Sequence, residues 1–461
     1  MPFLFENFHG RLNHVLQGEK RMRKKETILI LVLMMGIIFT LGSLGVSAEQ
    51  KYKQFEGVTL HVFANSHAPM LKANQWSIEQ VKEKMGINIV LDEASYGVQY
   101  EKAMSNFIAH TGAYDVIVMA HQWTGGWADA GYIYPLEEFI EKDTTFDPSI
   151  YISKAYFINS TWKGKQVGLP FNMEGRLVFY RKDIFAKEGL TVPTNREEWL
   201  DILKYFHNNP DYPGFYGGVY MYGREQGPAY PIETYWELFD WSKVKTTNAF
   251  WDANFQNIMD EKTLIEALHF WQDVREYFPP GVEAYNLPEA YEFFMDGKAA
   301  MTEVWPLTLY GMLLERPDFM SKVGAMVPPT GKPFSGGWAI GICGDSKVKE
   351  AAWEYIKFMT SLENDLMFSL EYGKGPSVIN TYSAPEAVKM YGKNMLKVQL
   401  KGIEEAVCCG KIPTMSEFYG GDFWILLNRC MLGELTPEEA APVIIKEMSG
   451  ILERGGYKQK K

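Results

Sequence analysis

Two short stretches of polar and aromatic residues stand directly after apolar runs of the kind that form strands, at 58–63 and 114–119. Amide, hydroxyl and imidazole groups donate and accept hydrogen bonds, and an indole ring offers a flat apolar surface. In a parallel sheet the carboxyl ends of neighbouring strands share one edge, and ligands of such sheets bind there. The candidate ligand-binding residues at these two strand ends are Asn65, Ser66, His67, Gln122 and Trp123.

Aromatic residues are more frequent than a core requires. The chain of 461 residues has 13 Trp, 26 Tyr and 28 Phe, which together make up 15%. Such a surplus is consistent with a site that stacks against ring-shaped ligands, and a large core would account for it equally well. A sugar ring has an apolar C–H face and a rim of hydroxyls. Its site therefore needs aromatic rings with acids, amides or arginine around them.

The sequence lacks the patterns that mark several kinds of catalytic and metal site. The eight His residues form no ligand cluster, and the four Cys residues have no zinc-site spacing. We find no glycine-rich phosphate loop, no His-Glu-x-x-His and no nucleophile elbow. The net charge of −11 argues against nucleic acid and anionic lipid as ligands. We therefore expect no metal, no cofactor and no nucleic-acid partner.

The N-terminal region has the pattern of an export signal. Basic residues at 20–25 precede an apolar stretch at 28–44, and Val46–Ala48 supplies small residues before a cut. Cleavage there would release a chain that begins at Glu49, although the apolar stretch is also just long enough to stay as a membrane anchor. Met22 is an alternative start. No Cys near the cut could carry a lipid, which favours a periplasmic location.

The four cysteines leave their redox state open. Cys408 and Cys409 are adjacent, so their Cα atoms are closer than the usual disulfide span. One of them could pair with Cys430, which would leave Cys343 and the other thiol free.

The coarse element pattern predicts a parallel α/β sheet. Strands at 58–63, 87–91 and 114–119 alternate with helices at 77–85 and 100–109. Later helices are expected at 264–278, 349–360 and 437–452, and an irregular stretch at 208–231. A capping-box pattern marks the start of the last of these helices, Thr436 to Glu439, and that of one further helix, Thr194 to Glu197. The length of the chain favours two lobes over one domain.

Several segments, in this order along the chain, resemble the family 1 extracellular solute-binding proteins of bacterial ABC importers. Each segment is weak alone, and their shared order and spacing carry the resemblance. The segments are Gly112–Val116 with Pro135–Glu137, Gly164–Pro170 with Phe179–Phe185, Phe294 with Gly297–Met301, Gly336–Ile340, and Ala352–Phe358.

The resemblance implies an α/β fold of two lobes, the type II periplasmic-binding-protein fold, in which each lobe is a mostly parallel sheet flanked by helices. It implies chain crossings near Pro170, Glu303 and Gly341, and lobes that close over a bound sugar by hinge motion. The expected parts are a signal peptide at 1–48, an N-terminal lobe at 49–170 and 303–340, and a C-terminal lobe at 171–302 and 341–461.

The resemblance also implies which residues meet the ligand. In similar proteins, polar residues after the first strand hydrogen-bond sugar hydroxyls, which points to 65–67. Gln122 stands where a relative has an acid, and an amide both donates and accepts whereas a carboxylate only accepts. The pattern of hydroxyls that is recognised may therefore differ. Glu174 matches a crossing-segment glutamate that contacts sugar in those relatives.

Two tryptophans and one acid lie beside the implied crossings. Trp305 and Trp338 are candidates for stacking on a sugar ring, and Gly337 beside Trp338 completes the predicted set. Glu303 would either accept hydrogen bonds from sugar hydroxyls or form a salt bridge with Arg176, two interpretations that the sequence leaves equally open. Composition alone adds two further candidates from the irregular stretch, Tyr220 and Tyr222.

The predicted function is therefore that of a monomeric binding protein, not an enzyme, that captures a carbohydrate outside the membrane and passes it to the permease of an ABC importer. A glycoside hydrolase is the main alternative, because paired carboxylates and aromatic rings around a sugar also describe that class. A sensor or adhesion protein with the same fold is the other.

Overall fold

The computed structural model describes residues 52–243 and 248–460. The predicted signal segment at 1–48 lies outside these ranges. The chain divides into two compact units, one made of residues up to Val58 with Gln80–Ile87, and the other of Thr59–Glu79 with the residues from Asn88 onward. The first unit contains the short 3-10 helix η1 (Lys53–Phe55), and within it the N–H of Gly57 donates to the carbonyl of Gly86 at 2.9 Å.

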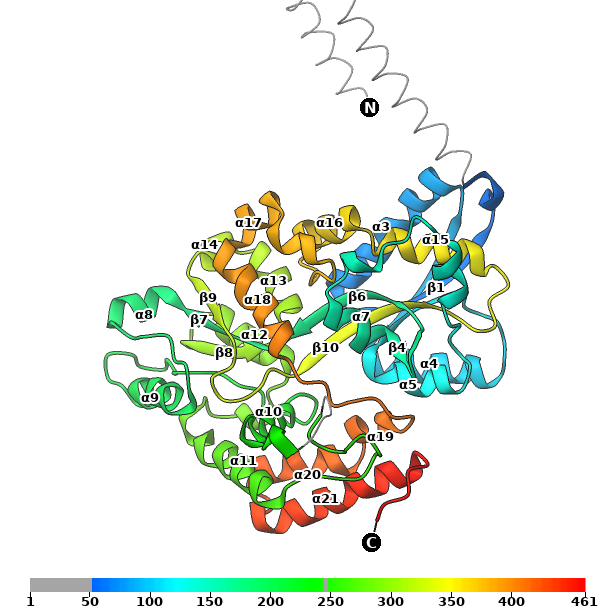
Figure 1. The fold of residues 1–461 in the computed structure, drawn as a ribbon. Helices are drawn as coiled ribbons and strands as arrows, with labels where there is room; N and C mark the ends of the chain where they lie inside the picture. Colours follow the sequence, from blue (N-terminus) through cyan, green and yellow to red (C-terminus); the bar gives the residue numbers. More distant parts are fainter. Residues whose placement is uncertain (1–51, 244–247, 461) are drawn as a thin grey trace, which may run out of the picture. The chain divides into compact units, whose positions relative to one another are not determined.

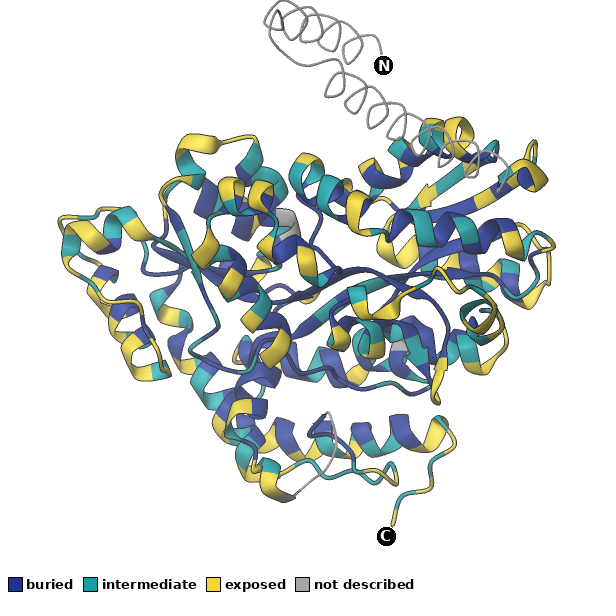
Figure 2. Ribbon diagram, turned by 45° about the horizontal axis from the view of Figure 1, so that its top comes forward, coloured by how far each residue is buried: buried dark blue, intermediate teal, exposed yellow. Residues whose placement is uncertain are grey.

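A five-stranded sheet in the second unit has the order β2-β1-β3-β10-β6 (Figure 1). Its strands are β1 (Thr59–Asn65), β2 (Asn88–Ala94), β3 (Val116–Ala120), β6 (Leu169–Gly175) and β10 (Ser335–Ile342). β1 pairs in parallel with β2 and β3, and β10 pairs antiparallel with β3 and β6. All five residues of β3 are buried, as its continuous apolar run predicted. Figure 2 shows the same burial in the central strands, which are dark blue.

Helices connect the first three strands. They are α3 (Ala68–Met85) and α4 (Tyr96–Ile108), so the predicted alternation of strand and helix is confirmed. Both helices begin earlier than predicted. For α3 the reason is that Pro69 lies in its first turn, where proline fits a helix without losing a hydrogen bond.

A three-stranded antiparallel sheet has the order β8-β7-β9. Its strands are β7 (Leu177–Arg181), β8 (Met301–Val304) and β9 (Val323–Met326). Tyr220 and Tyr222 lie in the core beside this sheet with no exposed surface. Trp199 Nε1 donates to the hydroxyl of Tyr220 at 2.8 Å, and the hydroxyl of Tyr222 donates to the carbonyl of Trp271 at 2.6 Å. These two tyrosines are therefore core residues rather than ligand contacts.

The chain changes from one sheet to the other at two places that differ from the predicted boundaries. Pro170 lies inside β6, because the pairing of β6 with β10 continues to Gly175. Glu303 pairs with Val178 in the three-stranded sheet, and the return to the five-stranded sheet follows Met326. Strand pairing therefore extends past residues 170 and 303, and the predicted lobe boundaries stay a prediction.

The predicted lobe boundary near 341 lies near the end of β10, which is followed by a helix that packs against it. The helix α15 (Lys349–Met359) packs against β10 and β6. Trp353 Nε1 donates to Asp143 Oδ2 at 3.1 Å, and Lys357 forms an ion pair with the same carboxylate. Helix α15 therefore stays with the five-stranded sheet, and the division of the chain into two lobes by residue number stays a prediction.

The remaining elements are mostly helices. Between β3 and β9 they are α5 (His121–Asp129), α6 (Glu137–Lys142), η2 (Pro148–Ile150), α7 (Ser153–Ser160), β4 (Thr161–Trp162), β5 (Lys165–Gln166), α8 (Lys182–Glu188), α9 (Arg196–Phe206), α10 (Ala229–Leu238), η3 (Trp241–Lys243), α11 (Glu261–Asp273), η4 (Val274–Tyr277), η5 (Val282–Ala284), α12 (Leu287–Met295), α13 (Pro306–Leu314) and α14 (Pro317–Met320). After α15 they are α16 (Leu362–Tyr372), η6 (Ile379–Ser383), α17 (Pro385–Tyr391), α18 (Lys393–Glu405), α19 (Met415–Gly420), α20 (Asp422–Met431) and α21 (Pro437–Arg454).

The two predicted capping boxes have different outcomes. At α21 the box is confirmed, because Thr436 accepts from the N–H of Glu439 and the Glu439 carboxylate accepts from the N–H of Thr436. At α9 the prediction is wrong by one residue. The N-cap is Asn195, whose side chain accepts from the N–H of Glu198 at 2.9 Å.

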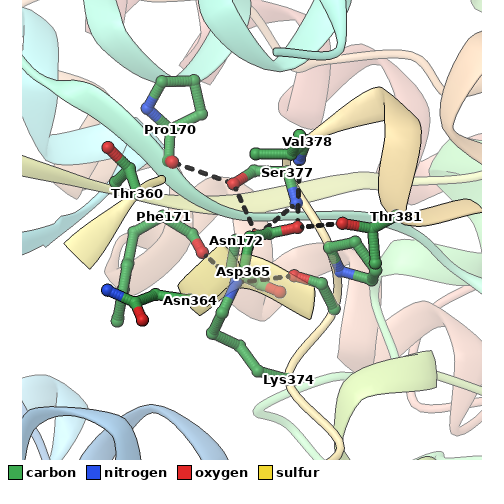
Figure 3. Close-up of polar contacts among 12 residues, drawn as sticks. Pro170, Phe171, Asn172, Thr360, Asn364, Asp365, Lys374, Ser377, Val378 and Thr381 are labelled. Atoms are coloured by element: carbon green, nitrogen blue, oxygen red, sulfur yellow. Dashed lines mark hydrogen bonds and ion pairs between the residues drawn. The ribbon is translucent and has the colours of Figure 1, made fainter. Parts of the chain in front are cut away.

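A buried ion pair anchors the segment after α16 to β6 (Figure 3). Lys374 Nζ donates to Asp365 Oδ1 at 2.9 Å, to the carbonyl of Phe171 at 2.6 Å and to that of Gly375 at 3.2 Å. The Asp365 carboxylate also accepts from Ser377, Val378 and Thr381. Every proton of the ammonium therefore has an acceptor, and both side chains are 1% exposed.

All four cysteines are buried free thiols, namely Cys343, Cys408, Cys409 and Cys430. Within residues 52–243 and 248–460, no helix has the length and apolar character needed to cross a membrane. The same residues contain no group of three or more side chains suited to hold a metal ion.

Candidate ligand-binding site

The polar residues at the end of β1 differ in exposure. Asn65 is 4% exposed, and its amide is used within the protein. Its Oδ1 accepts from the N–H of His67 at 3.0 Å, and its Nδ2 donates to Gln99 Oε1 on α4 at 3.1 Å. Gln99 in turn donates to the carbonyl of Val118 on β3 at 2.7 Å. Asn65 therefore fixes the edge of the sheet, whereas Ser66 is exposed there.

Two histidines near this edge are held in the neutral form. Burial lowers the pKa of His67 from its usual 6.5 to about 4. Burial also lowers the pKa of His121 to about 3, with a smaller contribution from the charge of Lys411, and a hydrogen bond with the backbone of Gly337 opposes both effects. The unfolded chain binds a proton at each histidine below about pH 6.5. Acidification toward pH 4 therefore removes stability that is fully present above pH 6.5.

This linkage gives a measurable expectation for His67. Urea unfolding of the protein should show a loss of about 1–2 kcal/mol from this residue between pH 7 and pH 5. The variant His67→Gln cannot take up the proton, so it should lose correspondingly less stability over the same interval. Equal losses in the two proteins would show that His67 titrates normally in the folded state.

Aromatic rings gather where α5 follows β3. The centroid of the Trp123 ring lies 4.8 Å from that of Tyr96, 5.1 Å from that of Trp127 and 5.7 Å from that of Trp338. Trp123 is only 4% exposed, whereas Trp338 is partly exposed. Most of the Trp123 ring is therefore covered by other rings, and Trp338 offers the more accessible surface.

Gln122 lies at the same place. Its Nε2 donates to the hydroxyl of Tyr96, and its Oε1 is buried without a hydrogen-bond partner among the described residues. An amide oxygen in this state loses its hydration without a replacement, which is unfavourable unless a donor reaches it. The structure thus brings Gln122, Trp123 and Trp338 together, as the predicted site requires.

The start of β10 connects these aromatic residues and Gln122 to a second group of residues, which lies around Trp305. A Cβ atom at Gly336 would lie 2.4 Å from Cζ3 of Trp305, and a Cβ at Gly337 would lie 2.0 Å from Nδ2 of Asn159. Only glycine allows such close approach, so Trp305 packs directly on the backbone of β10. Gly337 has a packing role against α7, which accounts for it without a ligand contact. Trp305 Nε1 donates to Gln226 Oε1 at 3.0 Å.

The second group is a buried charge cluster beneath Trp305. Arg176 has no exposed surface. Its Nε lies 3.9 Å from Glu303 Oε1, and its Nη1 lies 3.6 Å from Glu233 Oε1. Its guanidinium carbon lies 4.0 Å from the ring centroid of Tyr230 and 5.9 Å from that of Trp305. These are ion-pair and cation–π distances rather than hydrogen bonds.

Arg176 carries one positive charge against two buried carboxyl groups, so neutrality of the cluster requires a proton on one of them. Burial raises the pKa of Glu233 well above its usual value, and it also raises that of Glu303, while the charge of Arg176 opposes the shift at both. We assign the proton to Glu233, whose Oε1 also accepts from the N–H of Phe334 at 2.9 Å. With Glu303 ionised and Arg176 charged, the cluster is neutral overall.

Glu303 therefore has the salt-bridge role that the sequence left open beside ligand binding. It is fully buried, so direct contact with a ligand stays a prediction that requires the cluster to open. Glu174 is 4% exposed, accepts from Asn172 Nδ2 at 3.1 Å and pairs across the sheet with Gly336. It thus lies beside the Trp305 contact.

Sequence reasoning missed several neighbours of the site. Tyr96 comes two residues after the end of β2, as His67 comes two residues after that of β1, so the rule that found His67 could have found Tyr96 as well. Tyr230 and Glu233 lie on α10, which begins at the end of the stretch predicted to be irregular. No local pattern marked them, because their role depends on contacts with residues far away in the sequence.

Comparison with known proteins adds independent information. Residues 67–365 match the profile of the bacterial extracellular solute-binding protein family. A probable amino-acid ABC transporter periplasmic-binding protein of Sinorhizobium fredii is 24% identical over 426 residues, which span 88% of this chain and 92% of that protein.

Solved structures with similar folds include two ligand complexes. An ABC transporter solute-binding protein of Agrobacterium radiobacter K84 in complex with ribitol is 23% identical, with a TM-score of 0.73 over 86% of this chain and 99% of that one. The maltose-bound MalE3 of T. maritima is 20% identical, with a TM-score of 0.72 over 86% and 100%. These likenesses confirm the predicted two-lobed periplasmic-binding-protein fold.

Proposed function

The chain belongs to the bacterial extracellular solute-binding protein family, and from this premise we propose that it captures a neutral sugar or polyol and delivers it to the permease of an ABC importer. The observation that carries the proposal is a pair of partly exposed indole rings, with amide and carboxylate groups beside them. Trp338 belongs to β10, and Trp305 packs on the start of the same strand. Relatives of similar fold are solved with ribitol and with maltose, which are both polyhydroxylated.

In this proposal the ligand stacks on the accessible faces of Trp305 and Trp338. Ser66, Gln122 and Glu174 hydrogen-bond its hydroxyls, and the unpartnered Oε1 of Gln122 accepts from one of them. The other predicted residues hold this frame in place, namely Asn65, His67, Trp123, Glu303 and Gly337. The protein acts as an exported monomer in the periplasm, and its two lobes close over the ligand by hinge motion.

The charge cluster favours a neutral ligand and a binding role. An amino acid, for which one relative is named, carries an ammonium and a carboxylate that need counter-charges in the site. Arg176 and Glu303 already neutralise each other. A glycoside hydrolase needs two carboxyl groups at least about 5 Å apart around the scissile bond. Glu233 and Glu303 are both buried beside Arg176, so they do not flank a space that could hold a scissile bond.

A thermal-shift screen tests the proposed function. The panel comprises maltose, maltotriose, ribitol, mannitol and the common amino acids. A ligand that binds only the folded state raises the melting temperature. We expect at least one sugar or polyol to do so, and no amino acid. Stabilisation by amino acids alone would contradict the proposed ligand class, and release of shorter sugars during incubation would favour the hydrolase.

Removal of the Trp338 ring tests the stacking surface. Trp338→Ala should weaken binding of the stabilising sugar by about 1–3 kcal/mol, because the apolar face of the ring is lost. Trp76→Ala is the matched control, since Trp76 is also partly buried but its ring contacts are with Phe358 and Phe368. Calorimetry that finds the same affinity in both variants would remove Trp338 from the site.

A further inference from the structure

Asn159 lies at the C-terminal end of α7 and has no exposed surface. The helix packs against α5, β6 and β10, the three elements that carry Gln122, Glu174 and Trp338 (Figure 1). Ala155 lies one turn earlier on the same face and is also fully buried. An asparagine at this place calls for an explanation, because a buried amide needs hydrogen-bond partners within the protein.

The amide of Asn159 binds β6 beside Glu174. Its Nδ2 donates to the backbone carbonyl of Asn172 at 2.9 Å and lies 3.3 Å from Sδ of Met173. The side chain of Asn172 in turn donates from Nδ2 to Oε1 of Glu174 at 3.1 Å. Asn172 is fully buried, and its bond to the carboxylate is charge-assisted. Asn159 therefore fixes the backbone position from which Glu174 is oriented.

The same amide lies directly against β10. A Cβ atom at Gly337 would lie 2.0 Å from Nδ2 and 2.6 Å from Cγ of Asn159, so the amide fills the space that any larger residue there would need. Gly337 lies between Trp338 and Gly336, on which Trp305 packs. The register of β10 against β6 shifts directly after Trp338. Asn159 thus supports the strand segment that carries one indole ring and contacts the other.

A third contact joins Asn159 to α5. Its backbone carbonyl accepts from the hydroxyl of Thr124 at 3.1 Å, and Thr124 is also fully buried. Thr124 follows Gln122 and Trp123 directly in the sequence. One residue of α7 therefore contacts all three elements.

Stability alone does not account for this asparagine. Its Oδ1 is buried without a hydrogen-bond partner among the described residues. An unpaired buried oxygen is unfavourable, and an apolar side chain at this place would not have that cost. Local departures from the most stable choice are expected where a residue serves a functional site.

We propose that Asn159 is a positioning residue for the binding of a sugar or polyol: it does not touch the ligand, and it holds Gln122, Glu174 and Trp338 in one geometry. Contact groups act at full strength only when supporting residues hold them to within about 0.5 Å. The inference rests on the proposed function, and it assigns to this buried amide an effect on affinity.

Calorimetry of Asn159→Asp tests the inference. The probe is whichever of maltose, maltotriose, ribitol and mannitol most raises the melting temperature of the unmodified protein, and binding is measured well below the melting temperature of each variant. At about pH 9 an ionised carboxylate has no proton to donate to the carbonyl of Asn172. The dissociation constant should therefore rise about tenfold.

Acidification should restore the affinity of Asn159→Asp. Burial raises the pKa of the new carboxyl group, and its neutral form can again donate a hydrogen bond. We expect the recovery between about pH 9 and pH 6. A merely structural role would leave affinity independent of this titration, because the variant stays folded at the temperature of the measurement.

Asn74→Asp is the matched control. Asn74 is also fully buried, its Nδ2 donates to the carbonyl of Met70 at 2.8 Å, and its own carbonyl accepts from the hydroxyl of Ser77 at 2.6 Å. Both partners belong to α3. This variant should therefore lose comparable stability and keep its affinity.

Asn159→Ala removes the same amide without adding a charge, so it gives the comparison even if the aspartate variant does not fold. It should bind about tenfold more weakly than the unmodified protein, and acidification should not restore its affinity. The alanine variant also controls for Lys411, whose pKa burial lowers to about 8, so that it titrates over the same interval.

The outcomes separate the two proposals. Unchanged affinity in Asn159→Ala, an equal loss in Asn74→Asp, or no recovery of Asn159→Asp on acidification overturns the positioning role and leaves the proposed function standing. If the unmodified protein binds none of the four compounds, both proposals are overturned.

Discussion

Replacement of Asp365 by alanine is expected to lower the free energy of unfolding by about 3–5 kcal/mol. The carboxylate is the counter-charge of Lys374, and both side chains are 1% exposed. Without Asp365 the ammonium stays buried with only the carbonyls of Phe171 and Gly375 as acceptors. The N–H groups of Ser377 and Val378 lose their acceptor as well. Urea denaturation measures the change.

The control for this prediction is an exposed ion pair. Glu138 and Lys142 are paired on the surface of α6, so Glu138→Ala should change stability little. Asp365→Ala combined with Lys374→Met should recover part of the loss, because the unpaired charge is removed. A single variant as stable as the unmodified protein would mean that the buried pair does not anchor this segment to β6.

Replacement of Arg176 by methionine should be similarly damaging, with a loss of about 3–5 kcal/mol. Methionine replaces the aliphatic part of the arginine side chain but removes the charge that balances Glu303. The ionised carboxylate would then be fully buried without a counter-charge. The same change removes the cation above Tyr230, so Trp305 loses part of its support. Chemical denaturation gives the stability, and calorimetry gives the affinity for sugar.

Glu233→Gln distinguishes the two acids of the cluster. Because we assign the proton to Glu233, an amide of the same shape keeps the neutral state and can still accept from the N–H of Phe334. We therefore expect a change below about 1 kcal/mol. A Glu233→Gln variant as unstable as Arg176→Met would show that Glu233 is the ionised partner and that our assignment is reversed.

The sequence predicted those parts of the fold that depend on local patterns. The continuous apolar run of β3 indicated a strand covered on both faces, and the Thr436 capping box indicated the start of α21. The points at which the chain changes from one sheet to the other could not be located from the sequence, because they depend on pairing between distant strands. Nothing near Glu303 in the sequence shows that it pairs with Val178.

The candidate site was predicted only in outline, because local patterns give the position of a residue but not its packing. Strand ends mark the edge of a sheet, so Gln122 and Trp123 could be chosen from their positions alone. Whether a chosen side chain faces solvent or core depends on the residues packed against it. The sequence left Glu303 open between ligand contact and a salt bridge, and it proves to be buried against Arg176. The other partner of Arg176, Glu233, lies on a helix that was not predicted.

Calorimetric titration with the sugar or polyol that most raises the melting temperature tests the central claim most directly. We predict one ligand bound per chain with an affinity in the micromolar range, about −8 kcal/mol, which permits release to a permease. Mass spectrometry of the recovered ligand should find it chemically unchanged. Absence of binding by every sugar and polyol, or recovery of a shortened ligand, would contradict the account.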